Sequence, residues 1–459
     1  MVSEENITQL LFLTHLVAAT KGFNGGGIYD SGNDFSLDTN TLVLFIFCLA
    51  CALVLSYVYV WLARLFPKTF IWTTGILHIV FGFVTAIYML ARKYYSGGIV
   101  FLIFAVFTLI CFITWIPRIP FSALMLTTSV DVSKKFGHVY LVSFIGGIIA
   151  TAFGAWFSVT LVAVYVKYEP GANPACNTGA GGCSSAKVIG LIVFITFAGY
   201  WITEVLKNLI HTTISGVYGS WYFCSNNMPK GPTRGAARRA LTNSFGSVCF
   251  GSLIVAIINC LRQACSIAQQ TEANNGNFAA ECAFCILQCI IGILDWAVQF
   301  INRYAFSYIA LYGKSYIAAA KDTWTYVLPL PSSLLASLIP ISLIKDRGID
   351  ALVNECLIGP VLTMGATFVG YACALLAYLY LVFTAPGYNT NGQFTPVVVA
   401  YAFLIGLQIC QIFTTPISSG IDTIFVAAAF DPQVMIEQHG ELYGKLIAVY
   451  PHVQQAIHA

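Results

Sequence analysis

The 459-residue chain is too apolar and too weakly charged to build a water-soluble surface. Hydrophobic residues make up 58% of it and charged residues 9%, whereas an ordinary soluble domain is about 25% charged. The formal net charge of +3 gives no indication of a nucleic-acid-binding surface. These values exclude a soluble enzyme and predict an all-α, polytopic transmembrane helix bundle.

Residues 1–41 are predicted to be an N-terminal segment, made of a truncated first span and an outer loop. The run ITQLLFLTHLVAAT (7–20) is apolar over too short a distance to cross a bilayer. Glu4 and Glu5 stand where a signal peptide would be basic. Asn6 begins the one glycosylation sequon, NIT, and its use depends on which side of the membrane this segment occupies.

Residues 42–430 are predicted to form the transmembrane domain, because they contain nine apolar runs of about 18 residues or more. A cytoplasmic C-terminal tail, 431–459, follows. The nine runs lie at 42–63, 70–91, 98–116, 138–166, 187–211, 241–262, 280–302, 356–383 and 396–430.

Small residues four apart recur in two of these runs. One set is Gly146, Ala150 and Gly154, and the other is Ala366, Gly370 and Ala374. Such spacing lets two helix backbones approach closely in lipid. We therefore expect both faces to be buried between helices.

The distribution of basic residues predicts the topology. If the first span runs from outside to inside and the rest alternate, most of the 22 Lys and Arg residues fall on the inner side. The positive-inside rule then places the C-terminus in the cytoplasm. The loop GPTRGAARR (231–239) is interpreted as part of this topology signal, in contact with anionic lipid.

Most of the 15 cysteines lie inside the predicted spans, where cysteine behaves as a small apolar residue. Cys282 and Cys285 have the spacing of metal ligands, but no histidine or second cysteine pair accompanies them, so no metal site is expected. Cys176 and Cys183 flank the loop NTGAGG, which the topology places outside. They are a candidate disulfide, and two free thiols are the alternative.

The stretch RYAFSYIALYGKSYIAAAKDTW (303–324) carries a tyrosine at every fourth position from Tyr304 to Tyr316. This spacing keeps the tyrosines on one side of an α-helix, so we predict an interfacial or re-entrant helix that caps the inner mouth of the bundle. The letters GKS do not indicate a phosphate-binding loop, because Tyr308 stands where that loop requires a glycine.

Three carboxylates, Glu204, Asp295 and Asp422, lie deepest in apolar sequence, and ionisable groups within a membrane are functional candidates. Tryptophan accompanies two of them, and an aromatic face beside a carboxylate suits a quaternary ammonium ion. The structural alternative is that each carboxylate pairs with Lys207, Arg303 or the backbone. The candidate substrate-binding residues are Trp201, Glu204, Asp295, Trp296, Gln299 and Tyr304.

No constellation for enzymatic chemistry is present in the sequence. The seven histidines are scattered, and none accompanies a serine or cysteine in the local motif of a hydrolase. We therefore expect no catalytic residue and no cofactor.

Long stretches spread along the chain resemble the choline transporter-like family, and specifically its fungal branch, the pH nine-sensitive proteins. The resemblance implies a bundle of ten helical spans with both termini cytoplasmic. This chain departs from that pattern by showing nine full spans, and by carrying TYVLPLPSSLLASLIPIS (325–342) where the family passes directly onward. The resembling stretches include TWIPRIPFSALML (114–126), KNLIHTTISGVYGSWYF (207–223), INRYAFSYIALYGKSYIAAAKDTW (301–324) and TTPISSGIDTIFVAAAFDP (414–432).

The resemblance implies a plasma-membrane transporter for choline-like or other small organic cations. Proton coupling would require a carboxyl group that is neutral at one stage of the cycle and charged at another, with Glu204 as first choice and Asp295 as second. The alternative from another class is a non-transporting membrane protein that organises or senses lipids. Membrane lipids are expected partners in both cases.

Overall fold

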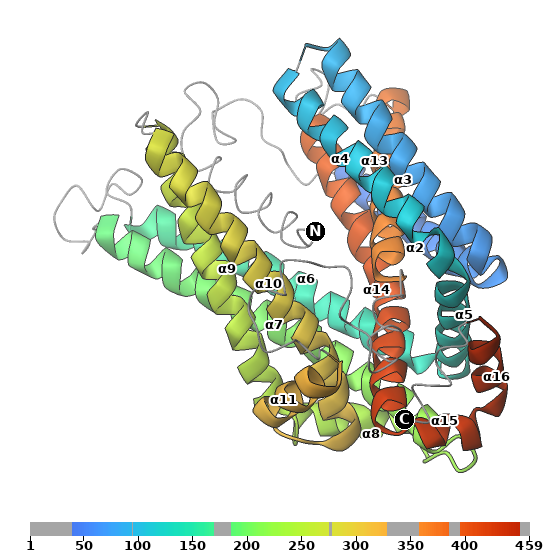
Figure 1. The fold of residues 1–459 in the computed structure, drawn as a ribbon. Coiled ribbons are helices and arrows are strands. Elements are labelled where there is room, and N and C mark those ends of the chain that lie inside the picture. Colours follow the sequence, from blue (N-terminus) through green and yellow to red (C-terminus); the bar gives the residue numbers. More distant parts are fainter. Residues whose placement is uncertain are drawn as a thin grey trace. The chain divides into compact units, whose positions relative to one another are not determined.

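The computed structural model describes residues 39–93, 95–168, 185–274, 278–327, 358–384 and 395–449, and within them every regular element is a helix. Figure 1 shows the helices as long rods. In chain order they are α2 (Thr39–Leu65), α3 (Pro67–Ala91), α4 (Tyr95–Trp115), the short 3-10 helix η1 (Ile116–Arg118), α5 (Ile119–Lys135), α6 (His138–Tyr168), α7 (Ser185–Phe223), α8 (Pro232–Leu241), α9 (Phe245–Asn274), α10 (Phe278–Tyr312), α11 (Tyr316–Val327), α13 (Ile358–Thr384), α14 (Thr395–Phe430), α15 (Pro432–Gln438) and α16 (Gly440–Val449).

Local sequence explains several helix starts. Proline occupies the first turn of α3, α8 and α15, as Pro67, Pro232 and Pro432. A proline there removes no hydrogen bond of the helix, because the first backbone N–H groups of a helix have no acceptor within it. Gly231, just before α8, has a φ of 66°, which glycine adopts without steric cost.

The predicted membrane-spanning character is confirmed. Among the described residues, 8 helices are long and apolar enough to cross a bilayer, and a shorter apolar stretch, His138–Gly154, begins α6. Together they overlap all nine predicted runs. The chain is therefore an all-α polytopic membrane protein.

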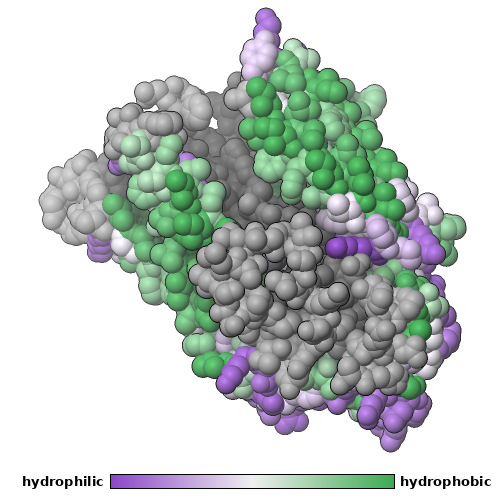
Figure 2. All heavy atoms as spheres, viewed as in Figure 1, coloured by the Kyte–Doolittle hydropathy of each residue, from purple (hydrophilic) through white to green (hydrophobic). Residues whose placement is uncertain are grey.

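Large hydrophobic side chains cover the outside of the spans, as Figure 2 shows over α3 and α4. In α4, Ile103 and Phe104 are each 63% exposed and Phe107 is 60% exposed. An apolar surface of this kind is unstable in water but suits the acyl chains of a bilayer.

The helices group into two compact units. Unit 1 contains the described residues within Leu141–Pro329 and Asp422–Phe430, and unit 2 contains the rest. The predicted domain 42–430 contributes to both. Within unit 2, the residues predicted to be a tail include α15 and α16, and α16 packs against α5.

In unit 2, close helix contact follows the predicted small-residue face. A Cβ atom added to Gly406 of α14 would lie 2.9 Å from the Cα atom of Gly370 in α13, so the two backbones nearly touch. Ala366 is 1% exposed and Ala374 is 8% exposed, which confirms that this face is buried. In unit 1, a Cβ atom on Gly146 of α6 would meet Ile210 of α7 at 2.2 Å, whereas Gly154 has open space around it.

The tyrosine-rich stretch 303–324 is divided between two helices. Its first part is the end of α10, whose chain reverses at Gly313 with a φ of 66°, and α11 starts at Tyr316. Tyr304 and Tyr308 are each 4% exposed and Tyr316 is 7% exposed. The prediction that all four tyrosines share one side of a single helix is therefore corrected, because the chain turns at Gly313 and Tyr316 belongs to α11.

Candidate functional site

The candidate site residues lie in unit 1, where α7, α9 and α10 pack along one another; Figure 1 shows α9 and α10 side by side. These helices are apolar overall but carry polar side chains on the faces they turn toward each other. Membrane helices gain little from apolar contact with one another, so interhelical hydrogen bonds and ion pairs contribute to their association.

Trp201 and Glu204 lie one turn apart on α7. The indole Nε1 of Trp201 donates a hydrogen bond of 2.9 Å to the Cys249 carbonyl oxygen of α9, which ties the two helices together. Glu204 is 8% exposed, and its Oε2 atom lies 3.8 Å from Nζ of Lys207. The predicted alternative partner of Glu204 is thus nearby, at a distance longer than a hydrogen bond.

Asp295 of α10 forms a close ion pair between α9 and α10. It is 3% exposed, and its Oδ2 atom lies 2.8 Å from Nη2 of Arg262 in α9. Gln299, one turn further along α10, donates from Nε2 to Asp295 Oδ1 at 3.0 Å. Both carboxylate oxygens of Asp295 therefore accept a hydrogen bond. The structure brings the predicted residues Asp295 and Gln299 together, and it adds Arg262, which was not among the predicted site residues.

Trp296 and Tyr304 lie away from this ion pair. The side chain of Trp296 is 58% exposed and packs on Phe300, with ring centroids 5.8 Å apart. Consecutive residues on a helix point about 100° apart, which turns Trp296 outward while Asp295 points inward. Tyr304 is buried with its ring edge-on to Phe300, at 5.0 Å. The expected Trp296–Asp295 face is therefore not present.

A second polar cluster joins α7, α10 and the end of α14. His211 Nε2 lies 3.0 Å from the Arg303 carbonyl oxygen and 3.0 Å from Ser307 Oγ. Asp422 is 6% exposed, with its Oδ2 atom 3.7 Å from Nε of Arg303. Arg303, one of the structural partners that the sequence offered for the buried carboxylates, thus lies beside Asp422. The sequence analysis missed this cluster. Its signal was the spacing of four residues between His211 and Ser215 and between Arg303 and Ser307, which places each pair on one helix face.

Hydrogen bonds also fasten the turn between α10 and α11. Asp322 Oδ2 accepts from Tyr308 Oη at 3.2 Å and from Lys314 Nζ at 2.9 Å. The bond from Lys314 holds the pKa of Asp322 below its ordinary value. Tyr316 Oη donates to Asn302 Oδ1, and Asn302 Nδ2 donates to the Gly251 carbonyl oxygen of α9 at 3.2 Å.

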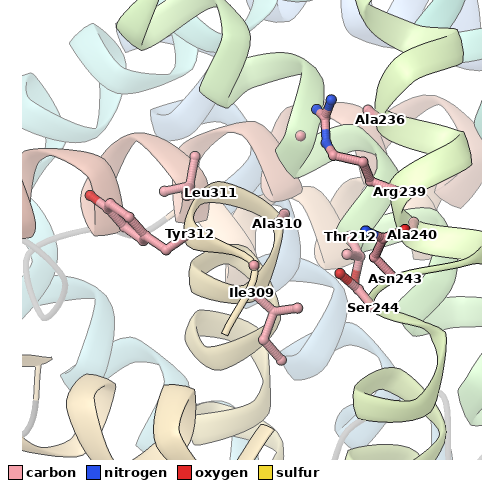
Figure 3. A pocket seen from close by; sticks show the side chains of 12 residues that line it. Thr212, Ala236, Arg239, Ala240, Asn243, Ser244, Ile309, Ala310, Leu311 and Tyr312 are labelled. Atoms are coloured by element: carbon pink, nitrogen blue, oxygen red, sulfur yellow. The ribbon is translucent and has the colours of Figure 1, made fainter. Parts of the chain in front are cut away.

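A cavity of about 270 Å³ opens between α7, α8 and the end of α10. Figure 3 shows Arg239, Asn243 and Ser244 on one side of it and Ile309 and Tyr312 on the other. The volume is slightly below that of most ligand pockets. Because a guanidinium group lines it, this cavity suits a hydrogen-bond acceptor or an anion better than an organic cation.

The remaining predicted sites are not all covered by the structure. Asn6, Cys176 and Cys183 lie outside the described residues, so glycosylation and the outer disulfide stay predictions. Each cysteine that the structure describes is a free thiol. Across the described ranges, no group of three or more His, Cys, Asp or Glu side chains could hold a metal ion.

The chain is similar to known membrane proteins over most of its length. A family model described as "Plasma-membrane choline transporter" matches residues 99–330 and 334–433, and the break between the two stretches falls inside the predicted insertion 325–342. The chain is 64% identical to Protein pns1 of Aspergillus fumigatus over 96% of this chain and 80% of that protein. It is 62% identical to Protein PNS1 of Gibberella zeae over 96% and 78%, and 42% identical to Protein PNS1 of Saccharomyces cerevisiae over 95% and 78%.

Proposed function

This chain belongs to the choline transporter-like family, and from that membership we propose that it is a multi-pass transporter for choline-like or other small organic cations. The multiple apolar helices are in accord with such a role. A plasma-membrane location and a cytoplasmic C-terminus, as the distribution of basic residues predicts, are part of the proposal.

The observation that carries the proposal is the burial of carboxylates within the apolar helices of unit 1. Glu204 is 8% exposed, Asp295 3% and Asp422 6%. A charged side chain inside a membrane is costly and persists where it serves a solute or ion pathway. A quaternary ammonium ion has no N–H to donate, so it binds through Coulomb attraction to a carboxylate and through the face of an aromatic ring.

Glu204 is the proposed cation-binding carboxylate. Its neighbour on the same face of α7 is Trp201. The indole N–H of Trp201 donates a hydrogen bond to the Cys249 carbonyl oxygen, which fixes the orientation of the ring. Asp295 is a weaker choice, because Arg262 and Gln299 already occupy both of its oxygens. Trp296 is dropped from the site because it faces outward.

Proton coupling follows as part of this proposal. A proton and an organic cation would compete for the one carboxyl group of Glu204, so that release of the proton favours uptake of the cation. This exchange requires the carboxyl to alternate between its neutral and charged forms during the cycle.

Purified protein in sealed vesicles provides the test. Uptake of labelled choline above that of empty vesicles, dependent on an imposed pH gradient, is the expected result. Absence of uptake under every ion or pH gradient would contradict the transport proposal. Uptake at the same rate with and without a pH gradient would contradict only proton coupling.

A lipid-organising role is the second candidate, and the basic face of α8 favours it. Arg234, Arg238 and Arg239 are exposed, and Arg239 lines the cavity of Figure 3. Clustered arginines near a membrane attract anionic headgroups. Binding of the reconstituted protein to anionic lipid, together with absence of solute flux, would select this role over transport.

A further inference from the structure

Polar residues of α10 lie on one side of the helix over much of its length. They follow the spacing i, i+4, i+7, i+11 and i+14, which keeps them within a narrow arc. The opposite side carries exposed isoleucines, with Ile286 64%, Ile290 58% and Ile293 68% exposed. The polar residues of this side are Gln288, Asp295, Gln299 and Asn302, and Gly292 occupies the i+4 position between the first two.

The partner helix α9 has the same division. Asn259, Arg262 and Gln263 are spaced by three and four residues and share one face. Ile257 is 45% exposed and Leu261 51% exposed on the opposite face. We call the two polar faces together the α9–α10 seam, and the ion pair between Arg262 and Asp295 crosses it.

Four buried polar atoms of the seam have no hydrogen-bond partner among the residues that the structure describes. They are Asn259 Nδ2, Arg262 Nη1, Gln263 Oε1 and Gln288 Nε2. The Asn259 side chain is itself more than nine-tenths buried, since Asn259 is 5% exposed. A buried polar group without a partner is destabilising, and within a bilayer no lipid chain can satisfy it. Such groups are typical of a site that holds water or a polar solute.

Gly292 leaves room for the ion pair. A Cβ atom placed on Gly292 would already stand 4.0 Å from Nη2 of Arg262, so a larger side chain would press on the guanidinium group. Along the antiparallel helices, Asn259 lies on one side of the pair, toward the start of α9. Gln288 lies on the other side, toward the start of α10.

We infer that the α9–α10 seam is a water-lined passage for a small polar solute, and that the Arg262–Asp295 ion pair closes it between Asn259 and Gln288. The inference rests on the proposed function in one respect, since a transporter needs a hydrated route across the bilayer. Water along the seam would satisfy the four polar atoms. Separation of Arg262 from Asp295 would join the two halves of the route.

Cysteine labelling with a charged, membrane-impermeant methanethiosulfonate tests the passage. The background is the full chain with Cys260, Cys265, Cys282, Cys285 and Cys289 replaced by alanine. Thiols react as thiolates, which form in water and not in lipid. We expect Gln288→Cys to react about tenfold or more faster than the lipid-facing Ile290→Cys, and Asn259→Cys to exceed Ile257→Cys in the same way. Equal rates within each pair would overturn the passage.

The side of attack tests the closure. With sealed vesicles, reagent on the side where α10 starts should modify Gln288→Cys, while reagent on the opposite side should modify Asn259→Cys. The double change Arg262→Gln with Asp295→Asn removes both charges, and it should allow either reagent to reach both positions. If Asn259→Cys reacts from both sides before this change, or keeps its sidedness after it, the ion pair is not the closure.

The labelling assay separates this inference from the transport proposal. It reports access of water and of a charged reagent to the seam, and it requires no substrate. Rapid labelling without choline uptake would retain the passage and contradict the substrate class. Uptake with no difference in labelling would retain the transporter and move its route elsewhere. Elution of each variant as one species on size exclusion shows that the rates refer to folded protein.

Discussion

Two helix hairpins, α3–α4 in unit 2 and α9–α10 in unit 1, are held together by different interactions. In the first, small residues allow close contact: a Cβ atom on Gly82 would lie 3.3 Å from the Cβ of Ala105. In the second, the Arg262–Asp295 pair and buried amides lie between the helices. The first hairpin is suited to anchoring in lipid, whereas the second retains costly polar groups that packing alone does not require.

The largest effect that this comparison predicts comes from breaking the buried ion pair. Asp295→Asn should lower the free energy of unfolding by about 3–5 kcal/mol, because it leaves Arg262 charged and uncompensated. Thermal unfolding in detergent measures the loss. The neighbouring change Trp296→Ala, at an outward-facing position, is the control and should have a much smaller effect.

A variant in which both members of the ion pair are neutral tests whether the loss is due to charge. Arg262→Gln combined with Asp295→Asn should recover most of the lost stability, since no unpaired charge remains. If the double variant is as unstable as Asp295→Asn alone, the shape of the side chains and not their charge holds α9 to α10.

The apolar hairpin should instead be sensitive to volume. A Cβ atom on Gly75 of α3 would lie 2.0 Å from the Phe112 ring of α4, so Gly75→Ala should cost about 1–3 kcal/mol through overpacking. Gly190→Ala in α7 adds the same atom where there is open space and serves as the matched control. Equal unfolding temperatures for the two variants would show that Phe112 turns aside without cost.

The next prediction concerns α7, which packs against the polar hairpin. Glu204→Gln should reduce the initial rate of choline uptake about tenfold, equivalent to about 1.4 kcal/mol, and should remove its pH dependence. Glu441→Gln makes the same chemical change on an exposed side chain outside the spans and should leave uptake unchanged. Full uptake with its pH dependence intact, at normal surface amounts of Glu204→Gln, would make Glu204 structural.

The smallest effect is expected at the α10–α11 turn. Because Lys314 lowers the pKa of Asp322, this carboxylate adds stability above its ordinary pKa, and the contribution is lost as the pH falls through the lowered pKa. Asp322→Asn should therefore decrease the unfolding temperature slightly at neutral pH and have no effect in strong acid. In a Lys314→Gln background the same substitution should have a much smaller effect at neutral pH.

The sequence alone was sufficient to predict the helical spans. A run of about 20 apolar residues is stable in lipid as a helix, in which each backbone group is hydrogen-bonded within the same helix. It also identified the buried carboxylates, because an ionisable residue inside such a run is visible without any contact map. The face shared by Trp201 and Glu204 followed in the same way from local helical spacing.

Only the tertiary structure decided which cation accompanies each carboxylate and where the tyrosines lie. Asp295 pairs with Arg262, 33 residues before it, and Arg303 lies beside Asp422, because helix packing brings together residues that are distant in the chain. Trp296 was misjudged because adjacency in sequence turns two side chains about 100° apart on a helix. Periodicity gives the face of a helix, but what that face meets depends on how neighbouring helices pack, and no local pattern contains that information.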